Sequence, residues 1–220
     1  MGVSSYKINL ELRFTMSMDL WECQQDEAMS EYYEELYLTE FRERAIDEFT
    51  AERLSSYYVE NSSLLADSFS ALEEAQKVSS LSPTSGLIMA AISIEIALKI
   101  GLLKPIVFGF VHSEAVAESI SNTVIKQTGI DRFKALLVTL LKDISHVDIA
   151  TYKRAGQQLS LWDERGKVQN LRNMISHKGS LSSMQDCQFA IDVAEEILNR
   201  LLPNVLGSLG LRLQNKVIIE

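Results

Sequence analysis

The sequence predicts a mainly α-helical protein. Over most of the 220 residues, apolar side chains recur at helical spacing, and only 10 glycines and 3 prolines interrupt them. Alternation of apolar and polar residues, the pattern of a half-buried strand, is strict over residues 5–16 and partial over 209–220. We therefore expect a helical bundle with a minor β element from the two termini, whose strands pair with each other, with a partner subunit or against a helix.

The composition is that of a folded, soluble protein, with 46% apolar and 23% charged residues. A net charge of −9 argues against a protein that coats nucleic acid, because such binding depends on many Lys and Arg contacts to phosphates. A nuclease, which needs only a local positive cleft, remains compatible with this charge. The two cysteines, Cys23 and Cys187, form neither a metal-binding cluster nor a disulfide framework, which favours a reducing, cytoplasmic location.

Membrane and cofactor motifs are not found in the sequence. The most apolar run, residues 87–98, contains Glu95 and is too short to span a bilayer, and charged residues interrupt the early apolar pattern. The chain contains no glycine-rich phosphate loop, no G-x-S-x-G nucleophile elbow and no H-E-x-x-H zinc motif. We therefore expect no membrane partner, no metal and no cofactor.

The chain should divide into three parts. Residues 1–59 are expected to form a strand and a helical extension, residues 60–205 a helical domain, and residues 206–220 a tail with a possible strand. Acidic residues concentrate between Glu22 and Glu60. Such a segment is compatible with restraint of a more basic site, although it is more often a solvated helix face.

The central helix is predicted between Leu87 and Ile100, a stretch that is apolar nearly all round. It should end near Gly101, with Pro105–Gly109 as a short connector. Glu95 is the charged exception on this helix, and a buried carboxylate needs a partner. The candidates are Arg172 and His177 of a later helix or, alternatively, Lys99 at the i+4 position.

That later helix should run from about Asp163 to Gly179, and it carries the most informative residues of the chain. Asn173 and His177 are spaced i and i+4 and share a face, while Arg172 lies on its flank. Histidine can give and take a proton near neutral pH, and arginine can bind a phosphate. Asparagine can orient either the imidazole or an oxygen of the ligand. This chemistry suits attack by a ribose 2′-hydroxyl on its own phosphodiester. By spacing alone, ordinary surface residues are the more frequent explanation.

The segment Arg172-Asn173-x-x-x-His177 resembles the R-N-x-x-x-H form of the R-x4-6-H signature of HEPN-domain ribonucleases. The Glu95 helix, the segment Leu103–Gly109 that follows it and the long helix Met184–Leu202 after the motif are also similar to this family. The resemblance covers residues 60–205. It implies a HEPN-like helical bundle, to which this chain would add an N-terminal helical extension.

The resemblance implies a metal-independent endoribonuclease, of the kind found among bacterial toxins and abortive-infection effectors. Arg172, Asn173, His177 and Glu95 would form its catalytic site, and the products would carry a 2′,3′-cyclic phosphate and a 5′-hydroxyl. It also implies a homodimer with two facing motifs, which agrees with the need of transesterification for both an acid and a base. An antitoxin or other regulatory partner would restrain the activity.

Cations near the motif suggest a track for the RNA backbone, formed by Arg165, Lys167 and Lys178. Trp162 at the start of the helix is either a packing residue, which is the commoner case, or a stacking platform. Two other functions stay open. The chain could be a non-catalytic HEPN module for dimerisation or for binding a partner such as a nucleotidyltransferase antitoxin, or an all-α adaptor unrelated to HEPN proteins.

Overall fold

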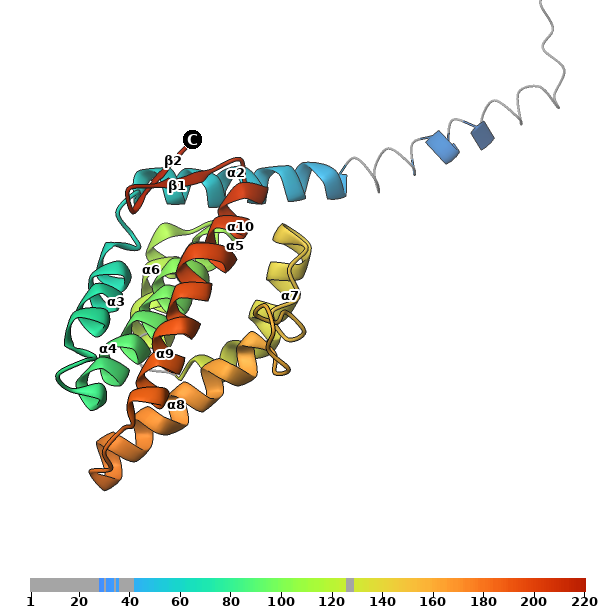
Figure 1. Cartoon of the computed structure of the whole chain (residues 1–220). Coiled ribbons are helices and arrows are strands. Elements are labelled where there is room, and N and C mark those ends of the chain that lie inside the picture. Colours follow the sequence, from blue (N-terminus) through green and yellow to red (C-terminus); the bar gives the residue numbers. More distant parts are fainter. Residues whose placement is uncertain (1–27, 30, 34, 36–41, 126–128) are drawn as a thin grey trace, which may run out of the picture. The chain divides into compact units, whose positions relative to one another are not determined.

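The computed structural model describes residues 28–29, 31–33, 35, 42–125 and 129–220. The chain forms two compact units, residues 1–46 and 47–220. In the first unit, the described residues are helical. The second unit is a helical bundle with one small antiparallel sheet near its C-terminus (Figure 1). The prediction of a mainly α-helical protein is confirmed.

The helices and strands of the described residues follow one another in this order: α2 (Arg42–Glu60), α3 (Ala66–Val78), α4 (Pro83–Ile96), the π-helical η2 (Ala97–Leu103), α5 (Lys104–Phe110), α6 (Glu114–Ile120), the π-helical η3 (Ser121–Ile125), the 3-10 turn η4 (Ile130–Phe133), α7 (Lys134–Ser145), α8 (Leu161–Lys178), α9 (Met184–Glu196), the π-helical η5 (Ile197–Leu201), α10 (Leu202–Ser208), β1 (Arg212–Gln214) and β2 (Val217–Ile219).

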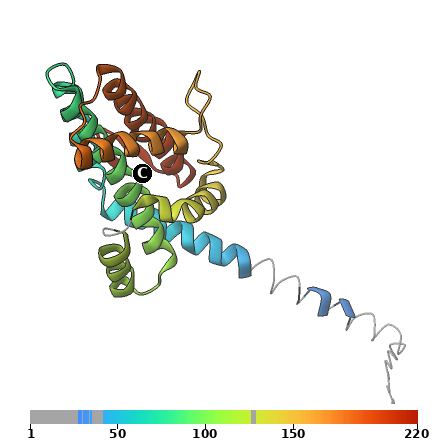
Figure 2. The same cartoon turned by 90° about the horizontal axis from the view of Figure 1, so that it is seen from below.

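Helix α4 is the centre of the bundle and packs against α3, α8 and α9 (Figures 1 and 2). Its contact with α9 is close, because a Cβ at Gly86 would meet the sulfur of Cys187 at 2.6 Å. Its contact with α3 includes two buried serines, Ser68 and Ser93, and each hydroxyl donates to the backbone carbonyl of the other residue at 2.7 and 2.8 Å. These contacts fix the helix on which the rest of the bundle packs.

The central helix does not end near Gly101, and Pro105–Gly109 is not a connector. The chain stays helical from Pro83 to Phe110 through η2, a π-helical segment. Pro105 has no N–H to donate to the carbonyl of Gly101 four residues earlier. That carbonyl instead accepts a 2.7 Å hydrogen bond from the buried hydroxyl of Tyr58 on α2. A side chain from another helix therefore satisfies the group that proline leaves free.

The continuous helix Pro83–Phe110 has 28 residues and is long and apolar enough to cross a membrane. The prediction that no apolar helix reaches this length is wrong, because it assumed an end near Gly101. In the structure, 67% of the most apolar window of this helix is buried inside the protein. The core helix of a soluble protein has this property.

The C-terminal stretch forms a hairpin of two short strands, not the single strand predicted for residues 209–220. Strands β1 and β2 pair antiparallel, and the turn between them places Asn215 and Lys216 at φ of 50° and 67°. Two successive residues with positive φ are typical of a tight hairpin turn. The N–H of Ile218 donates to the carbonyl of Ser62, which ties the hairpin to the turn between α2 and α3. The strand predicted for residues 5–16 lies outside the described residues.

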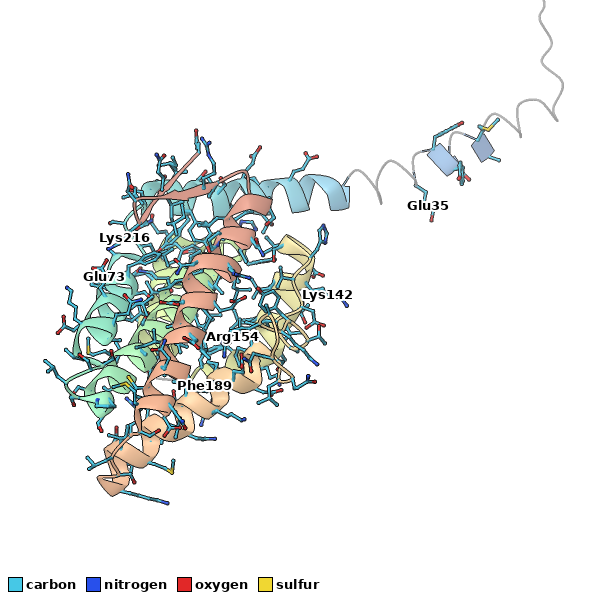
Figure 3. All side chains as sticks on the ribbon, viewed as in Figure 1. Glu35, Glu73, Lys142, Arg154, Phe189 and Lys216 are labelled. Carbon is cyan, nitrogen blue, oxygen red and sulfur yellow. The ribbon has the colours of Figure 1, made fainter. Side chains whose placement is uncertain are left out.

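The second compact unit begins at Asp47, before the domain boundary expected at residue 60. The reason is the packing of α2, because Leu54 and Tyr58 are among the fully buried side chains of the core. The hairpin adds a polar contact to the bundle, since the amine of Lys216 pairs with the carboxylate of Glu73 on α3 (Figure 3). Residues on both sides of the expected 60–205 domain therefore belong to one core.

Candidate functional site

Helix α8 carries the motif, and its predicted extent is confirmed. The hydroxyl of Ser160 accepts a hydrogen bond from the N–H of Asp163 and caps the first turn. At the other end, Gly179 adopts a left-handed conformation with φ of 64°, and its N–H donates to the carbonyl of Ile175 at 3.0 Å. The motif occupies the last two turns of this helix, next to its C-terminal cap.

The first half of α8 is anchored by a buried ion pair. The guanidinium of Arg154 donates two hydrogen bonds, of 2.7 and 2.9 Å, to the carboxylate of Glu164, whose side chain is 1% exposed. This bond raises the pKa of Arg154 above its ordinary value. The same guanidinium lies 5.7 Å from the ring centre of Phe189 on α9 (Figure 3). The segment before α8 is thereby tied to both α8 and α9.

Arg165 is not on the RNA-binding surface where we expected it. Its residue is only 4% exposed, and its guanidinium pairs with Asp131 of η4. The guanidinium also lies over the ring of Trp162, 4.6 Å from the ring centre. Trp162 is itself buried, as expected for the packing role and not for a stacking platform. Arg165 thereby ties α8 to the η4 turn.

The three motif residues are more accessible. Arg172 and Asn173 are half-buried, and His177 is exposed. The side-chain oxygen of Asn173 accepts hydrogen bonds from the amide of Gln169 at 3.0 Å and from the guanidinium of Arg172 at 3.4 Å. Among the described residues, no hydrogen bond or ion pair involves the imidazole of His177. Asn173 therefore has a normal hydrogen bond from Gln169 and a long one from Arg172, and His177 has no partner among the described residues.

Arg172 and His177 do not meet within one chain. Five positions on a helix correspond to a rotation of about 500°, which leaves the two side chains about 140° apart around the axis. One chain therefore leaves Arg172 and His177 on different sides of the helix, although Asn173 shares a face with His177.

Glu95 is not part of this cluster. Its carboxylate lies 2.7 Å from the amine of Lys99, in the i+4 arrangement that the sequence offered as the alternative. The loop after the motif contacts the opposite end of α4, since the N–H of Ser182 donates to the hydroxyl of Thr84 at 3.0 Å. Thr84 and Glu95 are separated by about 16 Å of helix. The expected contact of Glu95 with Arg172 or His177 is therefore not formed.

Of the three cations expected to bind RNA, Lys167 and Lys178 are exposed. They are eleven positions apart, so they point about 20° from each other around the axis and lie about 16 Å apart along it. The two amines therefore lie along one face of α8.

A groove that sequence reasoning missed lies between these two lysines. It has a volume of about 400 Å³ and is lined by residues of α8 and α9: Lys167, Asn170, Leu171, Met174, Asp186 and Phe189. The four residues from α8 are spaced at 3, 1 and 3, which is the spacing of one helical face. This spacing is visible in the sequence, but the contribution of Asp186 and Phe189 is not, because it depends on how α9 packs.

A second cavity, of about 610 Å³, lies between α2, α5 and α6. In this cavity the guanidinium of Arg53 lies over the ring of Phe49, and the amine of Lys104 lies over that of Phe108. None of the motif residues lines it. The described residues contain no group of three or more His, Cys, Asp or Glu side chains that could hold a metal ion.

Comparisons of the chain with protein-family models, with curated proteins and with solved structures find no match. The candidate site is therefore defined by its own geometry. It consists of Arg172 and Asn173, the imidazole of His177 that contacts none of the described residues, two exposed lysines on the neighbouring face, and the groove between α8 and α9.

Proposed function

We propose that this protein is a metal-independent endoribonuclease of the HEPN type, acting in the cytoplasm as a toxin or defence effector. The observation that carries the proposal is the state of the motif on α8. The guanidinium of Arg172 lies 3.4 Å from the side-chain oxygen of Asn173, and His177 has no partner among the described residues. All three side chains lie at the end of a helix whose first half is anchored by buried contacts.

The chemistry would be transesterification at one phosphodiester. A histidine takes the proton from the ribose 2′-hydroxyl, and the 2′-oxygen forms a bond to phosphorus. The bond from phosphorus to the 5′-oxygen breaks, and a second histidine gives that oxygen a proton. Arg172 binds the phosphate and the charge that develops on it. The products are a 2′,3′-cyclic phosphate and a 5′-hydroxyl.

One chain supplies a single imidazole on this helix, and Arg172 points about 140° away from it. A two-fold dimer with its α8 helices facing each other would bring the partner's His177 into the same cleft. The cleft would then contain an acid, a base and two guanidiniums. The proposed active form is therefore a homodimer.

Apolar side chains at the motif end of the bundle support this dimer. Leu81 in the α3–α4 loop and Leu181 in the α8–α9 loop are 88% and 89% exposed, and Met184 is 48% exposed. The N–H of Ser182 in the α8–α9 loop donates to the hydroxyl of Thr84 in the first turn of α4, which directly follows the α3–α4 loop. Exposed apolar residues that gather in this way are typical of an interaction surface. The apolar contact would also offset the repulsion between two chains of net charge −9.

The same apolar end favours one other candidate function, a non-catalytic HEPN module that dimerises or binds a regulatory protein such as an antitoxin. Such a module would use Leu81, Leu181 and Met184 in the same way. It would not need a free His177. The two functions therefore differ in whether His177 matters for RNA.

The test is RNA cleavage by mixtures of wild type and the His177→Ala variant. The two proteins are mixed in equal amounts, allowed to exchange subunits, and incubated with total RNA and tRNA in EDTA. If one cleft needs both imidazoles, only wild-type dimers cleave, and activity falls to about a quarter of that of an equal total amount of wild type.

Activity of one half would show that each chain acts alone, and this result would contradict the dimeric site. An absence of cleavage by wild type alone would contradict the nuclease and favour the non-catalytic module. Sedimentation of the same samples shows whether the variant still forms dimers, and native mass spectrometry of the mixture shows whether the subunits exchange.

A further inference from the structure

The groove between α8 and α9 has the size and the walls of a binding site for one small ligand. Its volume of about 400 Å³ falls in the usual range for such sites. Leu171, Met174 and Phe189 make its walls apolar. Met174 lies where α8 packs against α9, but its side chain is still 40% exposed. The groove is therefore an open, partly apolar surface.

The rim of the groove has unused hydrogen-bonding groups. Asn170 is exposed, and no hydrogen bond from its side chain to a described residue is present. One carboxylate oxygen of Asp186 accepts a 2.6 Å bond from Ser183, and the other has no such partner. The amine of Lys167 is exposed at the opposite end. The rim thus presents two acceptors, one amide donor and one cation.

The groove is next to the motif. Asn170 and His177 are seven positions apart, so they point about 20° from each other around α8 and lie about 10 Å apart along it. Asn173 lies between them on the same stripe, and Met174 is three positions before His177. An extended, polymeric ligand bound along this stripe would pass from the imidazole of His177 directly to the rim of the groove.

We propose that the groove binds the base of one nucleotide of the RNA whose scissile phosphate lies at Arg172 and His177; this inference rests on the proposed function. The base would lie against Met174 and Phe189, because single-stranded RNA is held mainly by contacts to the faces of its bases. Lys167 would bind a backbone phosphate. The two acceptors, on Asp186 and Asn170, favour a base with an amino group, namely adenine, cytosine or guanine, over uracil.

The test uses the full-length His177→Ala protein labelled with ¹³C at the methionine methyl groups, titrated with AMP, CMP, GMP and UMP. The methyl signal of Met174 should shift and saturate with the three amino-bearing nucleotides at lower concentrations than with UMP. Met184 is an exposed methionine outside the groove, and its signal should stay in place. The Asn170→Ala variant should weaken binding about fivefold, which corresponds to the loss of one hydrogen bond. Asn204→Ala, at an exposed position on α10, should not.

Three results would overturn the assignment: no response of Met174 at millimolar nucleotide, an equal response of Met184, or equal binding of all four nucleotides. A Met174 signal that changes with protein concentration and not with nucleotide would show that a second copy covers the groove, and would also overturn it. The nuclease is judged separately, by cleavage with wild type. A responsive Met174 together with inactive wild type would refute the nuclease and leave a nucleotide site, whereas active wild type with a silent Met174 would refute the groove alone.

Discussion

Replacing His177 with alanine should reduce RNA cleavage about 100- to 10,000-fold, the usual contribution of a general acid or base. In the proposed dimer, one substitution removes both imidazoles from the cleft, so the loss should lie toward the upper end. The fold should be nearly unaffected. The side chain is exposed, and its contribution at the C-terminal end of α8 is at most about 1 kcal/mol.

The measurement is the initial rate of cleavage of tRNA in EDTA, with thermal unfolding followed on the same preparations. His146→Asn is a matched control, because His146 is another exposed histidine and its left-handed backbone, with φ of 55°, is tolerated by asparagine. The control should cleave like wild type. If His177→Ala keeps more than about a tenth of the wild-type rate, its side chain does not perform the proton transfer.

Replacing Glu164 with alanine should reduce the free energy of unfolding by about 3–5 kcal/mol, the usual cost of breaking a buried pair from one side. The carboxylate is 1% exposed, and its removal would leave the guanidinium of Arg154 buried without its main partner. Arg154 also lies 3.7 Å from Asp192, but that carboxylate is half-exposed and compensates little. The substitution should loosen the first half of α8, on which the motif depends.

Urea unfolding measures this loss, and two further variants make it specific. The double substitution Arg154→Met with Glu164→Leu should recover most of the stability, because it removes both charges and keeps apolar volume. Glu74→Ala removes an exposed carboxylate on α3 and should change the unfolding free energy by less than about 0.5 kcal/mol. A loss of under about 1 kcal/mol in Glu164→Ala would mean that the pair does not anchor α8.

The features that sequence could predict are local ones. The apolar period and the glycine at 179 predicted the extent of α8 apart from its first residues, since the helix begins at Leu161 after a capping serine at 160. The contact between Arg172 and Asn173 was not expected, because neighbouring residues on a helix point about 100° apart. By contrast, the i+4 spacing of Glu95 and Lys99 offered the pair that the structure forms.

The features that sequence could not predict depend on which helices meet. Gly101 and Pro105 are ordinary helix-ending signals, and the hydroxyl that donates to the Gly101 carbonyl belongs to Tyr58, on a helix far away in the chain. Arginine is usually found on the surface, and Arg165 is buried here because it contacts Asp131 and Trp162. Because of these tertiary contacts, the central helix is longer than predicted, and one of the cations expected to bind RNA is buried.

The groove illustrates the same limit at the candidate site. Lys167, Asn170, Leu171 and Met174 form a recognisable face of α8 in the sequence. That face becomes one wall of a groove only because Phe189 and Asp186 of α9 pack beside it. Residue spacing on one helix gives the motif, whereas the second helix gives the volume in which a ligand could lie.

The most direct test of the proposed chemistry uses an RNA oligonucleotide with one cleavage site and the same oligonucleotide with a single 2′-deoxy residue on the 5′ side of the scissile phosphate. Both are incubated with wild type in EDTA, and the product ends are identified by mass spectrometry. We predict that the RNA is cut to a 2′,3′-cyclic phosphate and a 5′-hydroxyl, and that the deoxy-substituted oligonucleotide stays intact at that bond. Equal cleavage of both, or a product with a 5′-phosphate, would contradict attack by the 2′-hydroxyl at the Arg172–His177 site.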